Sequence, residues 1–276
     1  MRAALADATR ALEGAGIEGA GRDARVLLAF ALDIPRDRVT LCLEDQLCAA
    51  AKSRLDDVID RRIAREPVSK ITGSREFWGR RFEVTADVLD PRPETESLIV
   101  AALQRPAATR LLDLGTGSGI LAITLLSEWP GATGIATDLS PDALDVAARN
   151  ANALAVADRL DLVRSDWFQN IRGKFDLIVS NPPYIAAVEM PALSPEVRDF
   201  DPEMALSDGA DGLSAYREIT TGAANHLQPG GCLMVEIGWT QGAQVADFFR
   251  AAGFSDVEIL PDMGGRDRAV RGFLHG

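Results

Sequence analysis

The sequence predicts an α/β protein with a doubly wound, mostly parallel sheet, preceded by a small N-terminal helical bundle. Two observations support this prediction. From about residue 93 onward, short apolar runs alternate with helical segments, which is the pattern of a parallel sheet covered by helices. Residues 1–73 instead repeat their apolar residues at helical spacing. We therefore expect a helical domain at 1–73, a connector at 74–92 and the sheet domain at 93–276.

Three apolar stripes define the expected helices of the first domain. Their members are Leu5, Ala8 and Leu12, then Val26, Leu27, Phe30 and Ala31, then Leu55, Val58, Ile59 and Ile63. No residue pattern in this domain indicates chemistry, so we expect a bundle that packs or contacts a partner. In the connector, aromatic and β-branched residues flank Gly79 between 77 and 88, as in a β-hairpin, and we expect a hinge there.

The remaining residues supply the expected sheet domain. Its predicted strands are 110–114, 132–137, 160–163, 175–180, 232–237, 257–260 and 268–274. Its predicted helices are 120–126, 141–154 and 242–252. Ser140 is the expected N-cap of the second of these helices, with Pro141 at its first position. Ligands of such folds bind beyond the carboxyl ends of the strands.

Composition excludes several classes of protein. The 276 residues are 47% hydrophobic and 25% charged, as in an ordinary globular chain. Their net charge of −12 argues against a broad surface that binds duplex nucleic acid. No apolar run approaches the ~20 residues of a membrane span. At the N-terminus, Asp7 interrupts the apolar residues too early for a signal peptide. We expect a cytoplasmic monomer that binds no membrane.

The cysteines and histidines do not form a recognisable disulfide or metal pattern. Cys42, Cys48 and Cys232 are odd in number and lack C-x-x-C spacing, which is typical of reduced cytosolic thiols. With only His226 and His275 available, a zinc site would depend mainly on carboxylates. We therefore expect no metal.

A glycine-rich loop follows the first predicted strand. It reads Asp113-Leu114-Gly115-Thr116-Gly117-Ser118-Gly119. Ile120 stands where a dinucleotide fingerprint requires its third glycine, which argues against a dehydrogenase. The loop suits a ligand without a pyrophosphate, because Asp113 and free amides near Gly115 can hold the two ends of an amino-acid moiety.

The next two strand ends add acceptors and an aromatic face. Asp138 is placed to accept hydrogen bonds from both hydroxyls of a ribose. Asp166 can accept from an exocyclic amine, and Trp167 offers a face for a purine. Amino acid, ribose and adenine in this order describe S-adenosyl-L-methionine, whose product after methyl transfer is S-adenosyl-L-homocysteine.

Asn181-Pro182-Pro183-Tyr184 directly follows the fourth predicted strand. The two prolines fix φ and remove backbone donors, so the carbonyls of Asn181 and Pro182 can face a ligand. An amide oxygen and a carbonyl aimed at one point fit the two hydrogens of a planar NH₂ group, with Tyr184 over its flat face. Holding both hydrogens favours a pyramidal nitrogen as the methyl approaches, so we predict N-methylation without a strong general base.

With these motifs the chain resembles the HemK-type protein-(glutamine-N5) methyltransferases that act on peptide chain release factors. The resemblance covers almost the whole chain through the segments 66–73, 75–79, 91–96, 181–185, 208–213, 227–231 and 264–268. It implies a Rossmann-like class I methyltransferase domain with a seven-stranded sheet. It also implies that the substrate is the glutamine of the Gly-Gly-Gln motif of release factors, and that methylation modulates translation termination.

The resemblance also implies roles for residues of the motifs. The cofactor would be held by Gly115, Thr116, Gly117, Ser118, Gly119, Asp138 and Trp167. The glutamine amide would be held by Asn181, Pro182, Pro183 and Tyr184, with Asn181 also bordering the cofactor. Arg92 and Glu94 would lie near the active site, and the helical domain would bind the body of the release factor. Lys70 departs from the family pattern, where we expect tyrosine in the hinge.

Other functions share parts of this pattern. A nucleic-acid methyltransferase could hold an exocyclic amine in the same way, but it needs a basic groove that the acidic composition disfavours. A methyltransferase for a glutamine of a ribosomal protein would use identical chemistry and differs only in motif detail. A module that binds the cofactor without turnover is disfavoured by Asn181 and Tyr184.

Overall fold

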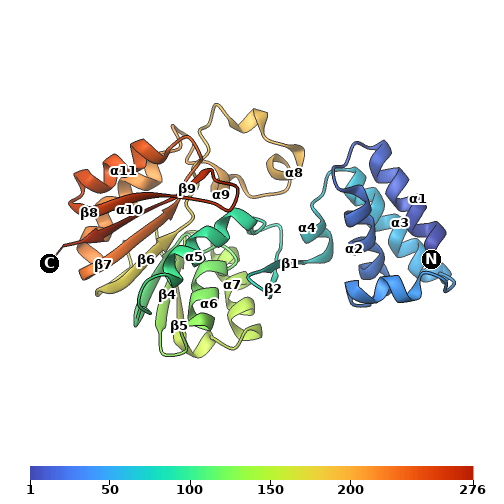
Figure 1. The fold of residues 1–276 in the computed structure, drawn as a ribbon, viewed down its shortest axis with the longest axis horizontal. Helices are drawn as coiled ribbons and strands as arrows, with labels where there is room; N and C mark the ends of the chain where they lie inside the picture. Colours follow the sequence, from blue (N-terminus) through green and yellow to red (C-terminus); the bar gives the residue numbers. More distant parts are fainter. Residues whose placement is uncertain (276) are drawn as a thin grey trace. The chain divides into compact units, whose positions relative to one another are not determined.

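Seven strands form one sheet in the order β5-β4-β3-β6-β7-β9-β8 in the computed structural model, which describes residues 1–275 (Figure 1). The strands are β3 (Arg110–Leu114), β4 (Thr133–Asp138), β5 (Leu160–Arg164), β6 (Phe175–Ser180), β7 (Leu227–Glu236), β8 (Phe254–Pro261) and β9 (Asp267–Leu274). The first five pair in parallel, whereas β9 is antiparallel to both of its neighbours. The predicted doubly wound, mostly parallel sheet is therefore confirmed.

Side chains of the central strands alternate between two hydrophobic cores. Leu111, Leu177 and Met234 face one core, which contains residues of α5 (Glu96–Leu103) and α6 (Ile120–Glu128). Leu112 and Leu233 face the other, which contains residues of α10 (Ser214–His226) and α11 (Gly242–Ala251). Because both faces are covered, each strand is a nearly continuous apolar run rather than an alternating one.

The register of the central strands brings three loops to one edge of the sheet. Leu114 of β3 pairs with Ser180 of β6, and Ser180 pairs with Val235 of β7. The glycine loop, the Asn-Pro-Pro-Tyr segment and the end of β7 therefore leave the sheet side by side. Strand order also reverses at β3, which is where open α/β sheets bind their ligands.

The chain divides into two compact units. Met1–Ser74 and Ser194–Phe200 form the first, and Arg75–Leu193 with the residues from Asp201 onward form the second. Besides the helices above, the second unit contains α7 (Pro141–Ala153) and the short α9 (Glu203–Leu206). Ser140 caps α7 as predicted, because its hydroxyl accepts a hydrogen bond from the Ala143 amide at 3.2 Å.

The first unit consists of helices around its own core. They are α1 (Arg2–Gly14), α2 (Ala20–Leu32), α3 (Ala49–Ile63) and α4 (Val68–Thr72), with a 3₁₀ segment at Arg36–Cys42 and the short α8 (Pro195–Arg198). Phe30 and Ile63 differ from the expected stripes, because their side chains lie 43% and 37% exposed rather than in the core. A buried ion pair joins α3 to α2, with Arg62 Nε 2.9 Å from Asp23 Oδ2.

The expected hairpin is present. Its strands are β1 (Ser74–Phe77) and β2 (Arg80–Glu83), and both turn residues have positive φ, 50° at Trp78 and 68° at Gly79. Such a two-residue turn matches the twist of the flanking strands. Phe77 and Phe82 anchor the hairpin by packing edge to face in the core of the second unit.

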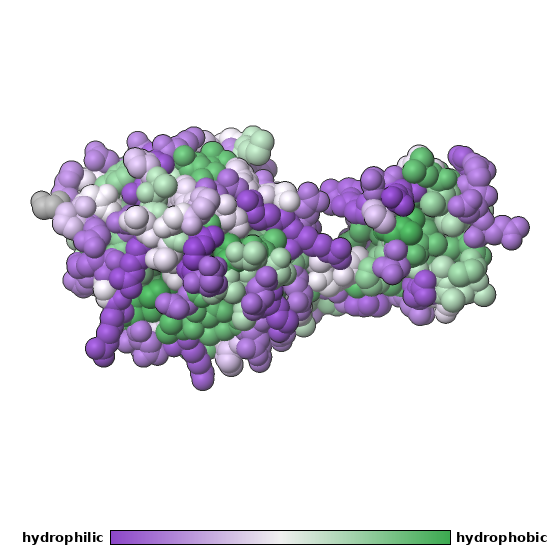
Figure 2. Space-filling model, turned by 90° about the horizontal axis from the view of Figure 1, so that it is seen from below, coloured by the Kyte–Doolittle hydropathy of each residue, from purple (hydrophilic) through white to green (hydrophobic). Residues whose placement is uncertain are grey.

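Hydrophilic residues are interspersed with smaller hydrophobic areas on the face of the molecule drawn in Figure 2. None of the helices in the described part of the chain combines the length and the hydropathy that crossing a membrane requires.

Candidate active site

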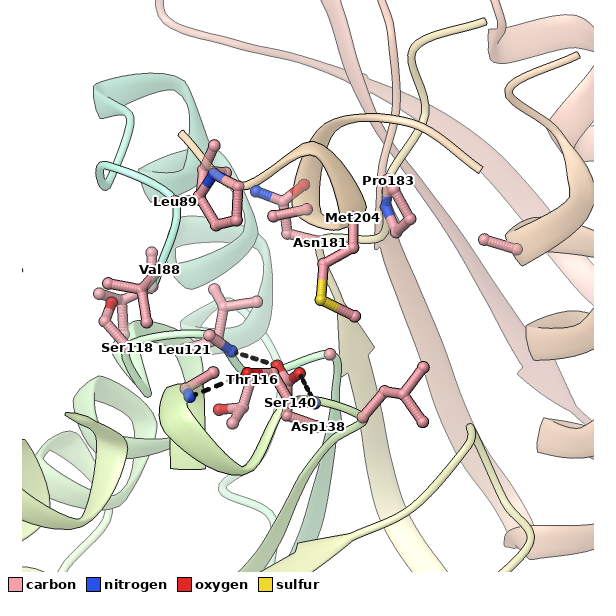
Figure 3. Close-up of a pocket in the computed structure, with 18 of the residues that line it drawn as sticks. Val88, Leu89, Thr116, Ser118, Leu121, Asp138, Ser140, Asn181, Pro183 and Met204 are labelled. Atoms are coloured by element: carbon pink, nitrogen blue, oxygen red, sulfur yellow. Dashed lines mark hydrogen bonds between the residues drawn. The ribbon is translucent and has the colours of Figure 1, made fainter. Parts of the chain in front are cut away.

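A cavity of about 380 Å³ opens where β3, β4, β5 and β6 end (Figure 3). This volume lies within the ~300–1,000 Å³ that is typical of small-molecule sites. The cavity brings together ten of the residues singled out from the sequence: Arg92, Gly115, Thr116, Gly117, Ser118, Asp138, Asp166, Trp167, Asn181 and Pro183. Loops from four successive parallel strands thus meet at one site.

The glycine loop is held in a single shape by its backbone. Gly115, Gly117 and Gly119 all have positive φ, at 67°, 55° and 85°. The Thr116 amide donates to the Thr137 carbonyl at 2.8 Å, which ties the loop to β4. A Cβ at Gly119 would lie 2.5 Å from Ile123 Cδ1, so close packing of the loop on α6 requires glycine there.

Asp138 joins the end of β4 to this loop. Its Oδ2 accepts a hydrogen bond from the Gly117 amide at 2.9 Å, and its Oδ1 accepts one from the Ser140 amide at 2.9 Å. Burial raises the pKa of Asp138, while the amide hydrogen bonds oppose that shift. Each carboxylate oxygen retains a further lone pair, and the residue lines the cavity, so Asp138 can still accept hydrogen bonds from a ligand.

Asp113 lies beneath the loop rather than in the cavity wall. Its side chain is completely buried, and its Oδ2 accepts hydrogen bonds from the Thr116 hydroxyl at 2.6 Å and the Ala122 amide at 3.2 Å. Burial raises its pKa to about 7. In this structure Asp113 supports the loop and ties it to α6, and its expected direct contact with an amino-acid moiety stays a prediction.

Trp167 and Asp166 form the wall beyond β5. Trp167 adopts a left-handed backbone, with φ of 44°, and its ring lies 3.9 Å from the position that a Cβ of Gly115 would occupy. Asp166 is exposed and accepts a hydrogen bond from Gln169 Nε2 at 3.1 Å. The indole and the carboxylate thus border the cavity from the same loop, as predicted.

The cavity wall also contains apolar residues that were not predicted. It includes Val88, Leu89 and Pro91 from the segment after the hairpin, and Met204 and Ala205 of α9. Figure 3 shows Met204 extending from the side of Asn181 toward Ser140. Only the fold brings α9 to this position, so the sequence contained no local signal for these contacts.

The Asn-Pro-Pro-Tyr segment begins directly at the sheet edge. Asn181 and Pro183 line the cavity, whereas Pro182 is buried behind it. Among the hydrogen bonds between described residues, none ends on the backbone carbonyl of Asn181 or Pro182. That these carbonyls accept hydrogen bonds from a ligand stays a prediction, which the fixed φ and missing donors of the two prolines support.

Tyr184 lies outside the cavity wall. Gln241 Nε2 donates a hydrogen bond to its carbonyl at 2.9 Å, and its hydroxyl donates to Glu236 Oε1 at 3.4 Å. Burial and the nearby Glu236 carboxylate raise the pKa of the Tyr184 phenol, so it stays protonated and remains a donor.

Glu236 is a buried acid next to the cavity that the sequence analysis also missed. It ends β7, is 1% exposed, and accepts a hydrogen bond from the Thr95 hydroxyl at 2.6 Å. Burial raises its pKa to about 7. The available signal was an acid inside the apolar run that ends at Ile237, since carboxyl groups are rarely buried without partners.

Arg92 and Glu94 differ in position. Arg92 lines the cavity, and its Nη2 donates to Asp201 Oδ2 at 2.7 Å. Glu94 is exposed and lies outside the wall. Elsewhere, no group of three or more His, Cys, Asp or Glu side chains among residues 1–275 is arranged to hold a metal ion.

Comparison with known proteins matches both parts of the chain. Residues 3–73 match the family model described as the PrmC N-terminal domain, and residues 89–193 match the methyltransferase small domain. A release factor glutamine methyltransferase of Cereibacter sphaeroides is 59% identical over 274 residues, which cover 98% of each chain. Another of the same description from Moorella thermoacetica is 44% identical over 273 residues, with 97% and 96% of the two chains covered.

A solved structure supports the fold. A methyltransferase from Pyrococcus furiosus superposes with a TM-score of 0.57 over 80% of this chain and 100% of its own length. Because the two sequences are 18% identical, this likeness bears on architecture alone.

Proposed function

The chain belongs to the family of release factor glutamine methyltransferases, and on that premise we propose that it methylates the side-chain amide nitrogen of the glutamine in the Gly-Gly-Gln motif of peptide chain release factors. The methyl donor is S-adenosyl-L-methionine, and the modification modulates translation termination. Such a substrate assigns the enzyme to the cytoplasm.

One observation carries the proposal for the site. The glycine loop with Asp138 and the Asn-Pro-Pro-Tyr segment with Asn181 open onto the same cavity. A methyl donor on one side and an acceptor amide on the other would therefore meet without rearrangement of the sheet, which converts an encounter of two molecules into a reaction within one complex.

The residues of the cavity fit S-adenosyl-L-methionine. Asp138 has lone pairs for the ribose hydroxyls, the glycine loop borders the space for the amino-acid end, and Trp167 with the apolar residues of the wall accommodates the adenine. When bound, this cofactor supplies an electrophilic methyl group on a sulfonium. Asp113 holds the loop in place from beneath, through Thr116.

The acceptor side orients the glutamine amide. Asn181 Oδ1 and the Pro182 carbonyl accept its two hydrogens, which favours a localised lone pair on the nitrogen. S-adenosyl-L-methionine, held by the glycine loop and Asp138, would supply the methyl carbon and its sulfur would keep the electron pair of the broken bond, while Asn181 and Pro182 hold the accepting nitrogen. The nitrogen then releases one proton to water, so no strong base is needed at the site.

We assign binding of the body of the release factor to the N-terminal unit. It exposes Leu41, which is 80% accessible, and Phe30, while its own core is formed by other residues. The exposed Leu41 offers a position at which this assignment can be tested. Leu41→Asp is expected to raise KM for the release factor several-fold and leave kcat unchanged, in steady-state methylation assays.

Methyl transfer from labelled S-adenosyl-L-methionine to a purified release factor tests the proposed function. Wild-type enzyme should label the intact factor but not a variant whose motif glutamine is replaced. Asn181→Ala should lower kcat/KM by roughly 100-fold or more. Asn152→Ala, on the exposed face of α7, is the matched control and should behave as wild type. Label on ribosomal protein or oligonucleotide instead of the factor would contradict the proposal.

A further inference from the structure

We propose that Thr95 and Glu236 position the Asn181 side chain, so that its oxygen rather than its nitrogen faces the acceptor amide. Thr95 and Glu236 are positioning residues that act through Asn181, and the inference rests on the function proposed above. The three side chains form one hydrogen-bonded chain that starts at the end of β7 and ends at the cavity.

The hydrogen-bonded chain consists of two links and is buried where it begins. The Thr95 hydroxyl donates to Glu236 Oε2 at 2.6 Å, and Asn181 Nδ2 donates to Thr95 Oγ1 at 3.3 Å. Thr95 is 0% exposed and Glu236 is 1% exposed. Asn181 is half-buried and lines the cavity, where Figure 3 shows it opposite Met204.

The number of available protons decides which way the Asn181 amide points. An ionised Glu236 can only accept, so the single Thr95 proton goes to the carboxylate. The Thr95 oxygen is then left with lone pairs alone, and the group of Asn181 that faces it must be the NH₂ donor. Because oxygen and nitrogen lie on opposite sides of the amide carbon, Oδ1 is turned away from Thr95 and remains free to accept from a substrate NH₂.

The same carboxylate also holds the far end of the motif. Tyr184 donates its hydroxyl proton to Glu236 Oε1 at 3.4 Å, while the Tyr216 hydroxyl donates to the Glu236 backbone carbonyl at 2.9 Å. One buried acid, Glu236, is therefore hydrogen-bonded to Tyr184 directly and to Asn181 through Thr95, so it contacts both ends of the Asn-Pro-Pro-Tyr segment. Charge-assisted hydrogen bonds of this kind are stronger than neutral ones, which suits a group that fixes geometry.

Protonation of Glu236 would reverse the direction of the hydrogen bonds that connect it to Thr95 and Asn181. A protonated Oε2 donates to Thr95, whose own proton must then go to Asn181, and this favours Oδ1 toward Thr95 and Nδ2 toward the substrate. Two donors would then face each other. The titratable groups around Glu236 are Arg268 of β9, Glu94 before α5, Tyr184 after β6 and Tyr216 of α10. Burial has a larger effect than these groups, and it raises the pKa of Glu236 to about 7.

Three variants test the inference against the wild-type enzyme and a release factor. Thr95→Val keeps the shape of the side chain but removes the hydroxyl, and should lower kcat about ten- to hundred-fold. KM for the release factor and Kd for S-adenosyl-L-methionine should change by less than about twofold. Thr95→Ser should restore most of kcat. Glu236→Gln can still accept from Thr95 but does not titrate, so its kcat should lack the fall below pH of about 7 that we expect of wild type.

The outcomes that overturn the inference are distinct from failure of the proposed function. Equal kcat in wild type and Thr95→Val would overturn it. Equal losses in Thr95→Val and Thr95→Ser, accompanied by weaker cofactor binding, would indicate packing alone and would also overturn it. If wild type labels no release factor, the proposed function fails. In that case the hydrogen-bonded chain of Glu236, Thr95 and Asn181 is tested by NMR. The chemical shift of the Asn181 side-chain ¹⁵N should change with pH in wild type and should not change in Glu236→Gln.

Discussion

Asp138 accepts a hydrogen bond from the Gly117 amide at 2.9 Å, so one carboxylate connects the glycine loop after β3 to the end of β4. The loop and the acceptor for a ribose are thereby fixed relative to each other before any ligand binds. A site whose polar groups are held in advance loses less entropy on binding.

Replacing this carboxylate should weaken cofactor binding. Asp138→Ala removes both the loop hydrogen bond and the ribose acceptor, and we expect Kd for S-adenosyl-L-methionine to rise roughly ten- to hundred-fold. Isothermal titration calorimetry provides the measurement. Asp145→Asn, exposed on α7, is the control. Unchanged affinity in Asp138→Ala would place the cofactor elsewhere.

The glycine loop should not tolerate a side chain at Gly119. With φ of 85° and Ile123 Cδ1 2.5 Å from the position of a Cβ, Gly119→Ala combines backbone strain with a steric clash. We expect the free energy of unfolding to fall by about 1–3 kcal/mol. Chemical denaturation would measure it, with Gly131→Ala as the control, because a Cβ there meets nothing within 4 Å.

Two glycines of the loop after α9 offer a matched pair. Gly209 and Gly212 both have positive φ, at 73° and 74°, so alanine strains the backbone equally. Only at Gly212 would a Cβ meet protein, 2.4 Å from the Tyr184 carbonyl. Gly212→Ala should therefore displace the Asn-Pro-Pro-Tyr segment and reduce kcat at least about tenfold, whereas Gly209→Ala should affect stability alone. Equal kcat values in the two variants would show that the segment does not depend on this contact.

Stability should fall as pH rises from about 4 to about 7. Burial raises the pKa of both Asp113 and Glu236 to about 7 in the folded protein, above their values in the unfolded chain. Their protonated forms therefore favour the folded state, and this contribution is lost as pH passes through about 7. In urea denaturation, Glu236→Gln should show a shallower dependence than wild type, whereas exposed Glu76→Gln should not. A steeper slope in Glu236→Gln would contradict the assignment.

This pH dependence is opposite to that of activity. Ionised Glu236 leaves Thr95 as the acceptor for the Asn181 NH₂ group, so the form that destabilises the fold is the form that orients the amide. Functional sites commonly retain such a cost in stability.

Local sequence patterns predicted the parallel strands well. The apolar runs at 110–114 and 175–180 match β3 and β6. Both faces of the sheet are covered, so these strands are continuous apolar runs that are easily recognised in the sequence. The strand expected at 232–237 begins earlier, at Leu227, because β7 includes Pro229-Gly230-Gly231, which are typical of a turn. A shift in register between Phe175 and Leu177 of β6 accommodates them.

Two of the longer helices that pack on the sheet, α5 and α10, were not predicted. α5 is apolar around most of its circumference and has no side-chain cap, so it lacks an amphipathic period. α10 also begins without a side-chain cap, directly after the glycine-containing loop at 208–213. Both helices are specified by packing on the sheet rather than by local signals.

The candidate site likewise contains residues that local sequence patterns predict and contacts that only the folded chain brings together. Residues at the ends of strands, such as Asp138 and Asn181, were predictable because parallel strands end at one edge. The link between Thr95 and Glu236 was not, because the two residues are 141 positions apart and meet only in the folded chain. Asp113 matched the motif, but its burial beneath the loop depends on the position of α6.

The most direct test of the proposed activity is tandem mass spectrometry of a release factor after reaction with the enzyme and S-adenosyl-L-methionine. We expect one added methyl group, located on the side-chain nitrogen of the motif glutamine, in wild type and in Asn152→Ala but not in Asn181→Ala. A methyl group on another residue, or undiminished methylation by Asn181→Ala, would contradict it.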